Sequence, residues 1–200
     1  MSKQCFIALN SDTVATPFGD LICADGGCKR AGGVKPLAII GDFDSSDTAD
    51  LENVIVYPKE KDFSDGELCL EYALENGYDE IVFSGVTGGR LDHQLANLSL
   101  IKKATESGVS AMGLDETGGK KIEIYYTEKP IRLSVRKGDL ISVMPFEFVT
   151  CHRASGVKYP LNDLTLNNSN LSYGLSNVAT ANEVEFEFTC GGTFVFRYEV

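Results

Sequence analysis

The spacing of apolar residues changes character along the chain. In the first part, short apolar runs alternate with stretches in which apolar residues recur every three or four positions. This alternation is typical of a parallel sheet whose strands are joined by crossover helices. The runs that predict buried strands lie at residues 5–9, 21–24, 37–40, 54–57 and 81–84, and the helical patterns lie at residues 64–76 and 95–107.

The second part of the chain has a period of two. Apolar and polar side chains alternate at residues 122–126, 131–135, 140–144, 184–188 and 193–198. Such alternation predicts antiparallel strands with one buried and one solvated face. The change of pattern falls at residues 115–120, which we interpret as a linker. We therefore predict an α/β fold in two domains, a Rossmann-like domain with a parallel sheet at residues 1–118 and an antiparallel β-sandwich at residues 119–200.

The net negative charge of the chain comes from its first part alone. Residues 1–118 contain nine Lys or Arg against 20 Asp or Glu, a net charge of −11, whereas residues 119–200 contain nine of each. An acidic surface of this kind repels nucleic acid, whose binding proteins rely on basic clusters. It also repels ATP unless cations mediate the contact.

Two further features bear on the cellular location. No apolar run approaches the roughly 20 residues that a membrane-spanning helix needs, and residues 1–10 lack the pattern of a signal peptide. The six cysteines are scattered and form no C-x-x-C pair, which predicts reduced packing residues rather than a disulfide framework or a zinc site. We expect a cytoplasmic protein that binds neither nucleic acid nor membrane.

Two candidate clusters follow the second and third predicted strands. Asp25 precedes Gly26 and Gly27, whose missing side chains permit a tight turn and a close approach of the backbone to a ligand. Asp42 and Asp44 lie two residues apart, so that in an extended segment their carboxylates point to the same side. Two such carboxylates repel each other unless a proton or a hard cation such as Mg²⁺ lies between them. A plain turn and a solvated acidic turn are the alternatives when each cluster is taken alone.

A third cluster stands at a junction between a strand and a helix. Ser64 and Glu67 form an S-x-x-E capping box, which predicts that a helix begins at Ser64. Asp65 then lies in the first helical turn, where the helix dipole favours negative charge. An ordinary capped helix explains these residues, but it does not explain the preceding Lys61 and Asp62. Lys61 could meet a phosphate as a point charge.

The fourth cluster is a glycine-rich turn before a predicted helix. Gly88 and Gly89 expose backbone N–H groups where the helix starts, which makes a natural anion site. Arg90 adds a planar guanidinium that suits phosphate oxygens, and Asp92 and His93 follow. Taken alone, His93 is more often a packing or hydrogen-bonding residue than a catalyst. The sequence has neither a Walker loop nor a G-x-G-x-x-G fingerprint, so these two nucleotide-binding motifs are excluded.

The four clusters carry more weight together than singly. In an open α/β sheet, ligands bind beyond the carboxyl ends of the strands, and all four clusters follow predicted strands. Many carboxylates, few bases and glycine turns at one edge favour a polyphosphate that is bridged by a metal ion. The alternative is a set of four unrelated acidic loops.

In this order, the clusters resemble the motifs of the thiamine pyrophosphokinase (thiamin diphosphokinase) family. The matching segments are Asp25-Gly-Gly, Gly41-Asp-Phe-Asp-Ser45, Lys61-Asp-Phe-Ser-Asp65 and Gly88-Gly-Arg-Leu-Asp-His93. Two segments of the second domain, Gly156-Val-Lys-Tyr-Pro-Leu161 and Leu175-Ser-Asn177, are also similar to the family, so the resemblance covers nearly the whole chain. It implies a homodimer with an N-terminal α/β domain, which binds ATP and Mg²⁺, and a C-terminal β-sandwich, which binds thiamine.

The resemblance also implies roles for single residues. The residues that would hold Mg²⁺ are Asp42, Asp44 and Asp62, and Asp65, Arg90 and Asp92 would complete the catalytic set. Those that would bind ATP and its phosphates are Asp25, Gly26, Lys61, Gly88, Gly89 and Arg90. Those that would form the thiamine pocket, across the dimer interface, are Ser176, Asn177 and Tyr159. The chain has no Trp, which some members place against thiamine, and Tyr173 is the alternative to Tyr159 for that stacking. Ser64 stands where the family often has Thr.

The implied reaction is the transfer of an intact diphosphate from ATP to thiamine. The hydroxyethyl oxygen of thiamine would attack the β-phosphorus of ATP and expel AMP, with Asp92 as a candidate acceptor of the hydroxyl proton. Three alternatives stay open: a related diphosphotransferase acting on a hydroxymethyl-pterin, a metal-dependent phosphohydrolase, and a non-catalytic sensor of thiamine or nucleotide.

Overall fold

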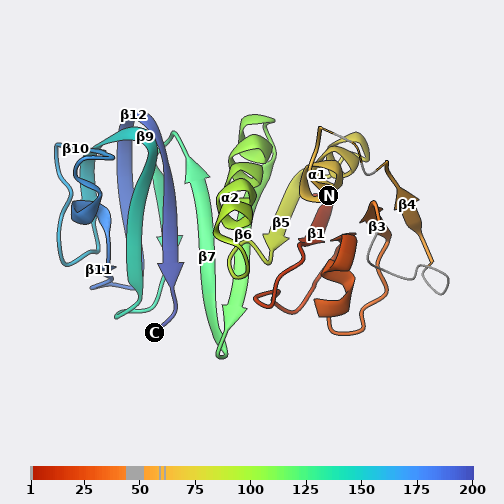
Figure 1. The fold of residues 1–200 in the computed structure, drawn as a ribbon. Coiled ribbons are helices and arrows are strands. Elements are labelled where there is room, and N and C mark those ends of the chain that lie inside the picture. Colours follow the sequence, from red (N-terminus) through yellow and green to blue (C-terminus); the bar gives the residue numbers. More distant parts are fainter. Residues whose placement is uncertain (1, 44–51, 59, 61) are drawn as a thin grey trace. The chain divides into compact units, whose positions relative to one another are not determined.

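The chain folds into two compact units, Met1–Thr117 and Gly118–Val200 (Figure 1). The computed structural model describes residues 2–43, 52–58, 60 and 62–200. Asp44 and Lys61, to which the sequence analysis assigned roles, therefore lie outside the described residues. None of the described helices is both long and apolar enough to cross a bilayer.

The first unit is built on a parallel sheet, as the apolar runs predicted. Its strand order is β6-β5-β1-β2-β3-β4, and every neighbouring pair is parallel. The strands are β1 (Gln4–Ala8), β2 (Asp20–Ala24), β3 (Ala38–Gly41), β4 (Val54–Val56), β5 (Glu80–Ser84) and β6 (Ser110–Thr117). The sequence analysis missed β6, because it placed the start of the linker at Asp115. That residue lies inside the strand and is fully buried.

The two α-helices of the first unit begin differently, because α1 has a side-chain cap and α2 has none. Helix α1 (Asp65–Glu75) starts with the predicted capping box: the hydroxyl of Ser64 accepts the N–H of Glu67 at 3.2 Å, and the Glu67 carboxylate accepts the N–H of Ser64 at 3.0 Å. Helix α2 (Leu91–Glu106) begins four residues before the predicted start. Leu91 and the predicted first residue, Leu95, are both exposed, at 70% and 57%, so the buried apolar face does not mark the first turn of this helix.

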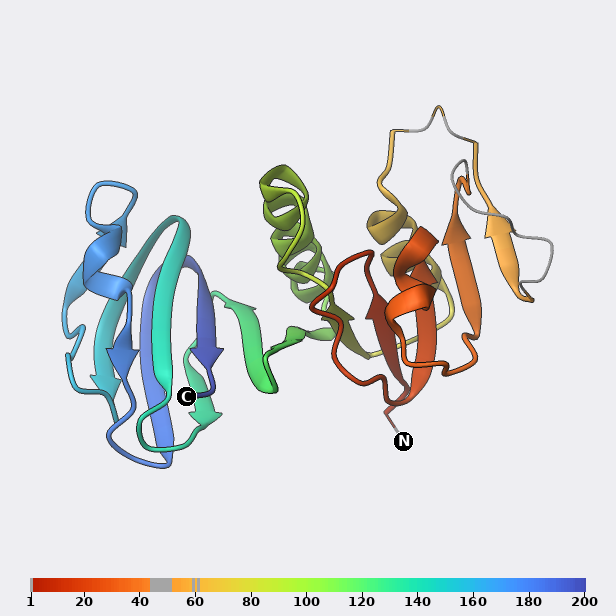
Figure 2. The ribbon, with the colours of Figure 1, turned by 60° about the horizontal axis from the view of Figure 1, so that its bottom comes forward.

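The second unit is antiparallel throughout (Figure 2). Its strands are β7 (Lys120–Thr127), β8 (Ile131–Ser134), β9 (Leu140–Ser155), β10 (Leu164–Asn167), β11 (Asn177–Val178) and β12 (Glu183–Tyr198). The two long strands β9 and β12 lie side by side, and they also pair with β10 and β11 on one side and with β7 and β8 on the other. Together these strands enclose one apolar core.

The two strands predicted at residues 184–188 and 193–198 are in fact the single strand β12. It continues through three irregularities in its register with β9, between Glu187 and Phe188, Phe188 and Cys190, and Gly191 and Thr193. Gly191 has a φ of +79°, and a Cβ there would lie 2.1 Å from the carbonyl oxygen of Phe148. The glycine therefore marks a bulge that lets the strand bend, rather than a break between two strands.

A buried ion triad ties β12 to its neighbours in the second unit. The Arg197 guanidinium lies 2.8 Å from Asp139 and 2.8 Å from Glu123. Burial alone would raise the pKa of Asp139, but hydrogen bonds from the Arg136 N–H and from Arg197 outweigh it and hold the pKa below its usual range.

Candidate functional site

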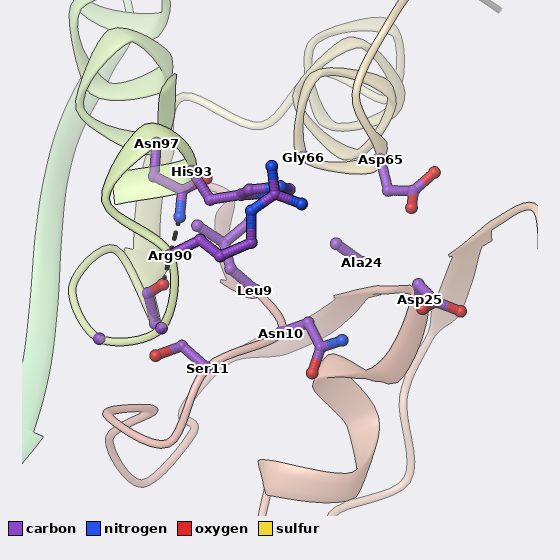
Figure 3. A pocket seen from close by; sticks show the side chains of 13 residues that line it. Leu9, Asn10, Ser11, Ala24, Asp25, Asp65, Gly66, Arg90, His93 and Asn97 are labelled. Atoms are coloured by element: carbon purple, nitrogen blue, oxygen red, sulfur yellow. Dashed lines mark hydrogen bonds between the residues drawn. The ribbon is translucent and has the colours of Figure 1, made fainter. Parts of the chain in front are cut away.

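A cavity of about 460 Å³ lies in the first unit, at the carboxyl ends of β1, β2 and β5 (Figure 3). This is the edge of a parallel sheet at which ligands bind, and the volume suits a small-molecule ligand. We call this cavity the cleft. Its lining residues are Leu9, Asn10, Ser11, Ala24, Asp25, Asp65, Gly66, Gly85, Gly88, Gly89, Arg90, His93 and Asn97.

Glycines let the backbone segments around the cleft pack closely. After β2 the chain forms a short 3-10 helix, Asp25–Arg30, where the sequence analysis expected a tight turn. A Cβ on Gly27 would lie 2.2 Å from the carbonyl oxygen of Ala8, so only glycine fits against the end of β1. A Cβ on Gly66, at the start of α1, would lie 2.7 Å from Leu100 of α2. These positions need glycine for close packing.

Asp25 is the strained residue of the cleft. Its φ of +43° lies in the left-handed region that disfavours residues with a side chain. Its Oδ1 atom is buried and has no hydrogen-bond partner among the residues that the structure describes. A Cβ on Gly41 would lie 3.1 Å from the Cβ of Asp25, so Asp25 packs against the end of β3 immediately before Asp42. A buried acceptor without a donor is costly, and strain of this kind is concentrated at functional sites.

A glycine-rich loop between β5 and α2 forms one wall of the cleft. We call residues 85–90 the glycine loop. Gly85 and Gly88 both have a φ of +82°, and Gly89 has a φ of +67°. The carbonyl oxygen of Thr87 accepts hydrogen bonds from the hydroxyls of Ser11, at 2.5 Å, and Thr13, at 2.7 Å. The segment that follows β1 thus fixes the middle of the glycine loop by hydrogen bonds.

Arg90 ends the glycine loop and occupies the N-cap position of α2, without a capping hydrogen bond from its side chain (Figure 3). Its guanidinium forms a two-pronged ion pair with Asp92, with Nε at 3.1 Å from Oδ1 and an Nη atom at 2.5 Å from Oδ2. The hydrogen bond from Arg90 lowers the pKa of Asp92, and the same bond raises the pKa of Arg90. Both side chains are well exposed, so Arg90 can reach a phosphate by leaving Asp92 at a small electrostatic cost.

The structure brings together only part of the site that the sequence predicts. Asp25, Asp65, Gly88, Gly89 and Arg90 line the cleft, and Gly26 is buried beside Asp25. Asp42 is half-buried just beyond β3, and Asp62 is exposed before α1. Within residues 2–43, 52–58, 60 and 62–200, no three His, Cys, Asp or Glu side chains cluster as metal ligands would. The metal set that includes Asp44 stays a prediction.

The three residues predicted to bind thiamine lie in the second unit. Asn177 is 2% exposed, and its side-chain amide is taken up by the backbone of Tyr159: Oδ1 accepts the N–H at 2.9 Å and Nδ2 donates to the carbonyl at 2.6 Å. Tyr159 is 55% exposed. Ser176 has a φ of +55° and donates its N–H to the hydroxyl of Ser142. Asn177 therefore positions Tyr159 in this chain.

The sequence analysis missed several residues that line the cleft, notably Asn10, Ser11 and Asn97. A signal for the first two was present, because they follow the first apolar run just as Asp25 follows the second. Ligands bind beyond the carboxyl ends of parallel strands, and we call this the strand-end rule. Applying it to all five apolar runs would have identified Asn10 and Ser11. Asn97 lies one turn inside α2, where its Nδ2 atom is 3.4 Å from the carbonyl oxygens of Gly85 and Val86. Its side chain thus supports the glycine loop from the helix.

The chain is similar to known proteins along most of its length. The family model described as "Thiamin pyrophosphokinase, catalytic domain" matches residues 19–112. The thiamine pyrophosphokinase of Bacillus subtilis (strain 168) is 31% identical over 175 residues, which are 82% of this chain and 75% of the relative.

Solved structures agree in fold. A crystal structure of the thiamine pyrophosphokinase from Bacillus subtilis superposes with a TM-score of 0.81 and 23% identity, covering 99% of this chain and 100% of the other. The structure of yeast thiamin pyrophosphokinase superposes with a TM-score of 0.76 and 13% identity, covering 98% and 86% of the two chains. At these identities the superpositions establish the fold alone, a mixed α/β architecture with a largely parallel part and antiparallel strands. The sequence match to the Bacillus relative goes further, and by it the chain belongs to the thiamin pyrophosphokinase family.

Proposed function

We propose that the chain is an ATP-dependent diphosphotransferase that converts thiamine and ATP to thiamine diphosphate and AMP. The observation that carries this proposal is the cleft itself, which is lined by Arg90 and the glycine loop on one side and by Asp25 and Asp65 on the other (Figure 3). The guanidinium of Arg90 and the backbone N–H groups of Gly88 and Gly89 would suit phosphate oxygens, whereas the carboxylates of Asp25 and Asp65 would suit a cation bound to those oxygens. Membership of the thiamin pyrophosphokinase family supports the same substrates.

The proposal includes Mg²⁺, which the donor set fits. The buried Oδ1 of Asp25 has no donor in the described part of the chain, and a metal ion or a donor group of the ligand would satisfy it. Asp42 follows the neighbouring strand end, and Asp44 and Asp62 would complete the oxygen ligands that Mg²⁺ prefers. When bound, Mg²⁺ would neutralise phosphate oxygens that otherwise meet a domain with a net charge of −11.

The residues of the glycine loop would bind and orient the diphosphate. Gly88 and Gly89 would present backbone N–H groups, and Arg90 and Lys61 would oppose the negative charge of the transferred and leaving groups. We assign Asp92 the role of pairing with Arg90 while no phosphate is bound, because the hydrogen bond from Arg90 lowers the pKa of Asp92 and makes it a weaker base.

The second unit would supply the thiamine site. Asn177 holds the backbone of Tyr159, which is 55% exposed, and the ammonium of Lys158 lies 5.2 Å from the centroid of the tyrosine ring. A flat heterocycle could stack on this ring by displacing Lys158 or by using the other face. Ser176 lies beside Asn177. We propose that these residues act at the interface of a homodimer, as the family resemblance implies, with the catalytic site in the first unit and the thiamine site in the β-sandwich. A cytoplasmic location belongs to the same proposal.

A product assay tests the function directly. The protein is incubated with ATP, Mg²⁺ and thiamine, and mass spectrometry measures thiamine diphosphate and AMP. Equal amounts of the two products are expected, with neither formed when thiamine is omitted. AMP or phosphate without an acceptor would indicate a phosphohydrolase, and product only with a hydroxymethyl-pterin would indicate the related transferase. Thiamine binding measured by calorimetry without any product would indicate a sensor.

The metal assignment has its own test. Asp42→Ala should nearly abolish AMP formation while leaving the fold intact, because a half-buried carboxylate beyond a strand end holds a ligand rather than the core. Asp163→Ala serves as the matched control, since this exposed aspartate lies in the second unit and pairs with His152. Near-normal turnover of the Asp42 variant would show that the metal is held elsewhere.

A further inference from the structure

Asp115 is a buried carboxylate that the proposed mechanism does not use. It lies in β6 and is 0% exposed. The strand before the glycine loop, β5, pairs with β6 in parallel, with Phe83 opposite Gly113. Asp115 therefore sits two residues beyond this register, directly beside the point where β5 ends and the loop begins.

The carboxylate receives the N–H groups of three successive loop residues. Its Oδ1 accepts from Gly85 at 2.6 Å and from Val86 at 3.1 Å, and its Oδ2 accepts from Thr87 at 2.6 Å. The hydroxyl of Thr87 also lies 2.6 Å from Oδ2. These four donors can all bind at once, because an ionised carboxylate has about four lone-pair sites.

Thr13 completes the arrangement from the other side. Its hydroxyl oxygen lies 3.1 Å from Oδ2 of Asp115 and 2.7 Å from the carbonyl oxygen of Thr87. Its single hydrogen can serve one of these acceptors at a time. The N–H and the hydroxyl of Thr87 therefore donate to Asp115, and its carbonyl oxygen accepts from Ser11 and Thr13.

Within the described part of the chain, Asp115 accepts hydrogen bonds only from uncharged N–H and hydroxyl donors. A buried charge without a cation persists only where several N–H dipoles point at it, as in an anion-binding nest. The carboxylate thus occupies, from inside the protein, the concave N–H face of residues 85–87. With this part of the loop fixed, Gly88, Gly89 and Arg90 are turned toward the cleft that they line.

We infer that Asp115 is the positioning residue of the glycine loop. Its carboxylate sets the loop in the shape that receives the diphosphate of ATP, without touching the substrate itself. This inference rests on the proposed function for its substrate, but its geometric part concerns the loop alone. It predicts that loss of the carboxylate weakens the use of ATP and leaves the use of thiamine unchanged.

Asp115→Asn is the direct test, since it keeps the shape and removes one acceptor. The amide nitrogen cannot accept a hydrogen bond, so either the N–H of Thr87 or the N–H groups of Gly85 and Val86 lose their acceptor. We expect the KM for ATP to rise at least tenfold and the KM for thiamine to stay within twofold. Asp139→Asn is the matched control, because Asp139 is also buried and accepts a backbone N–H, but it lies in the second unit. It should lower the melting temperature without a selective change in the KM for ATP.

A milder pair of variants covers the case in which Asp115→Asn does not fold. Thr87→Ser keeps the hydroxyl that Asp115 accepts, whereas Thr87→Val removes it with almost no change in volume. The valine variant should raise the KM for ATP several-fold, and the serine variant should restore the original value. Equal KM values for ATP in both variants, or equal rises for ATP and thiamine, would overturn the inference.

Amide hydrogen exchange separates this inference from the proposed function. In Asp115→Asn or Thr87→Val, the N–H groups of residues 85–87 should exchange at least tenfold faster, while those of β1 and β2 keep their rates. This result would stand even if the protein made no thiamine diphosphate, in which case only the proposed substrate would be wrong. Unchanged exchange at residues 85–87 would refute the positioning role whatever the enzyme assay shows.

Discussion

The sharpest prediction concerns Gly88, because two different physical effects meet there. Its φ of +82° is left-handed, which costs a residue with a side chain about 1–2 kcal/mol. A Cβ would also lie 2.7 Å from the hydroxyl oxygen of Ser11, which is held by its hydrogen bond to Thr87. Displacing that hydroxyl forfeits a hydrogen bond worth about 1 kcal/mol. The two effects together amount to about 2–3 kcal/mol.

Gly88→Ala should therefore lower kcat/KM for ATP roughly 30- to 150-fold, if the loop escapes the strain by changing shape and must return to bind ATP. If the loop keeps its shape, the same free energy appears as a lower free energy of unfolding. Steady-state kinetics with varied ATP and urea denaturation, carried out on the same preparation, show how the cost is divided.

Gly89→Ala is the matched comparison. Gly89 has a φ of +67° but no atom within 4 Å of the position of its Cβ, so only the backbone strain remains. Gly89→Ala should lower kcat/KM for ATP roughly 5- to 30-fold, by the same conversion of about 1–2 kcal/mol. Ser11→Ala combined with Gly88→Ala should cost less than the sum of the two single variants, because the first change removes the atom that the second would strike. Equal losses for the two alanine variants together with additive behaviour of the pair would refute this reasoning.

Three further predictions concern the stability and chemistry of the first unit. Ser64→Ala removes one half of the capping box of α1 and should lower the free energy of unfolding by about 1 kcal/mol in urea denaturation. Asp25→Asn should lower turnover on the order of a hundredfold while leaving the melting temperature equal or higher, because it neutralises a half-buried carboxylate whose buried Oδ1 has no donor in the described chain. A lower melting temperature would contradict this. Burial raises the pKa of Cys5 and Cys23 from 9.0 to about 12, so the folded state holds these thiols protonated where the unfolded chain releases the protons. The free energy of unfolding should therefore fall as pH rises from about 9 to 12, and Cys23→Ala should reduce that slope.

The parallel part of the fold could be predicted because its strands are continuous apolar runs between clear breaks. The strand β3 lies where its apolar run predicted it. Asp25 and Arg90 line the cleft beyond the carboxyl ends of strands, as expected of ligand-binding residues in such a sheet. The strand β6 was not predicted, because its end carries Asp115, a residue type that normally faces water. Only the donors of the glycine loop, some 30 positions earlier in the sequence, explain why that carboxylate can be buried.

The second unit was harder to predict for a related reason. The Gly191-Gly192 pair reads as a turn, yet pairing with β9 carries the strand through it. Asn177 could be singled out by resemblance, but its hydrogen bonds to the backbone of Tyr159 depend on a fold that local sequence does not reveal. Both features depend on contacts between segments that are distant in the sequence. The spacing of apolar residues along the chain gives no information about such contacts.

The unusual backbone of Asp25 has a consequence for protein engineering. A glycine at this position would relieve the left-handed φ of +43° and remove the unmatched Oδ1 atom in one step. Directed evolution that selects for heat resistance alone would thus favour variants at the very residue that we place in the ligand site. Libraries of this chain that are screened for thermostability need a parallel screen for turnover, or the most robust clones will be inert.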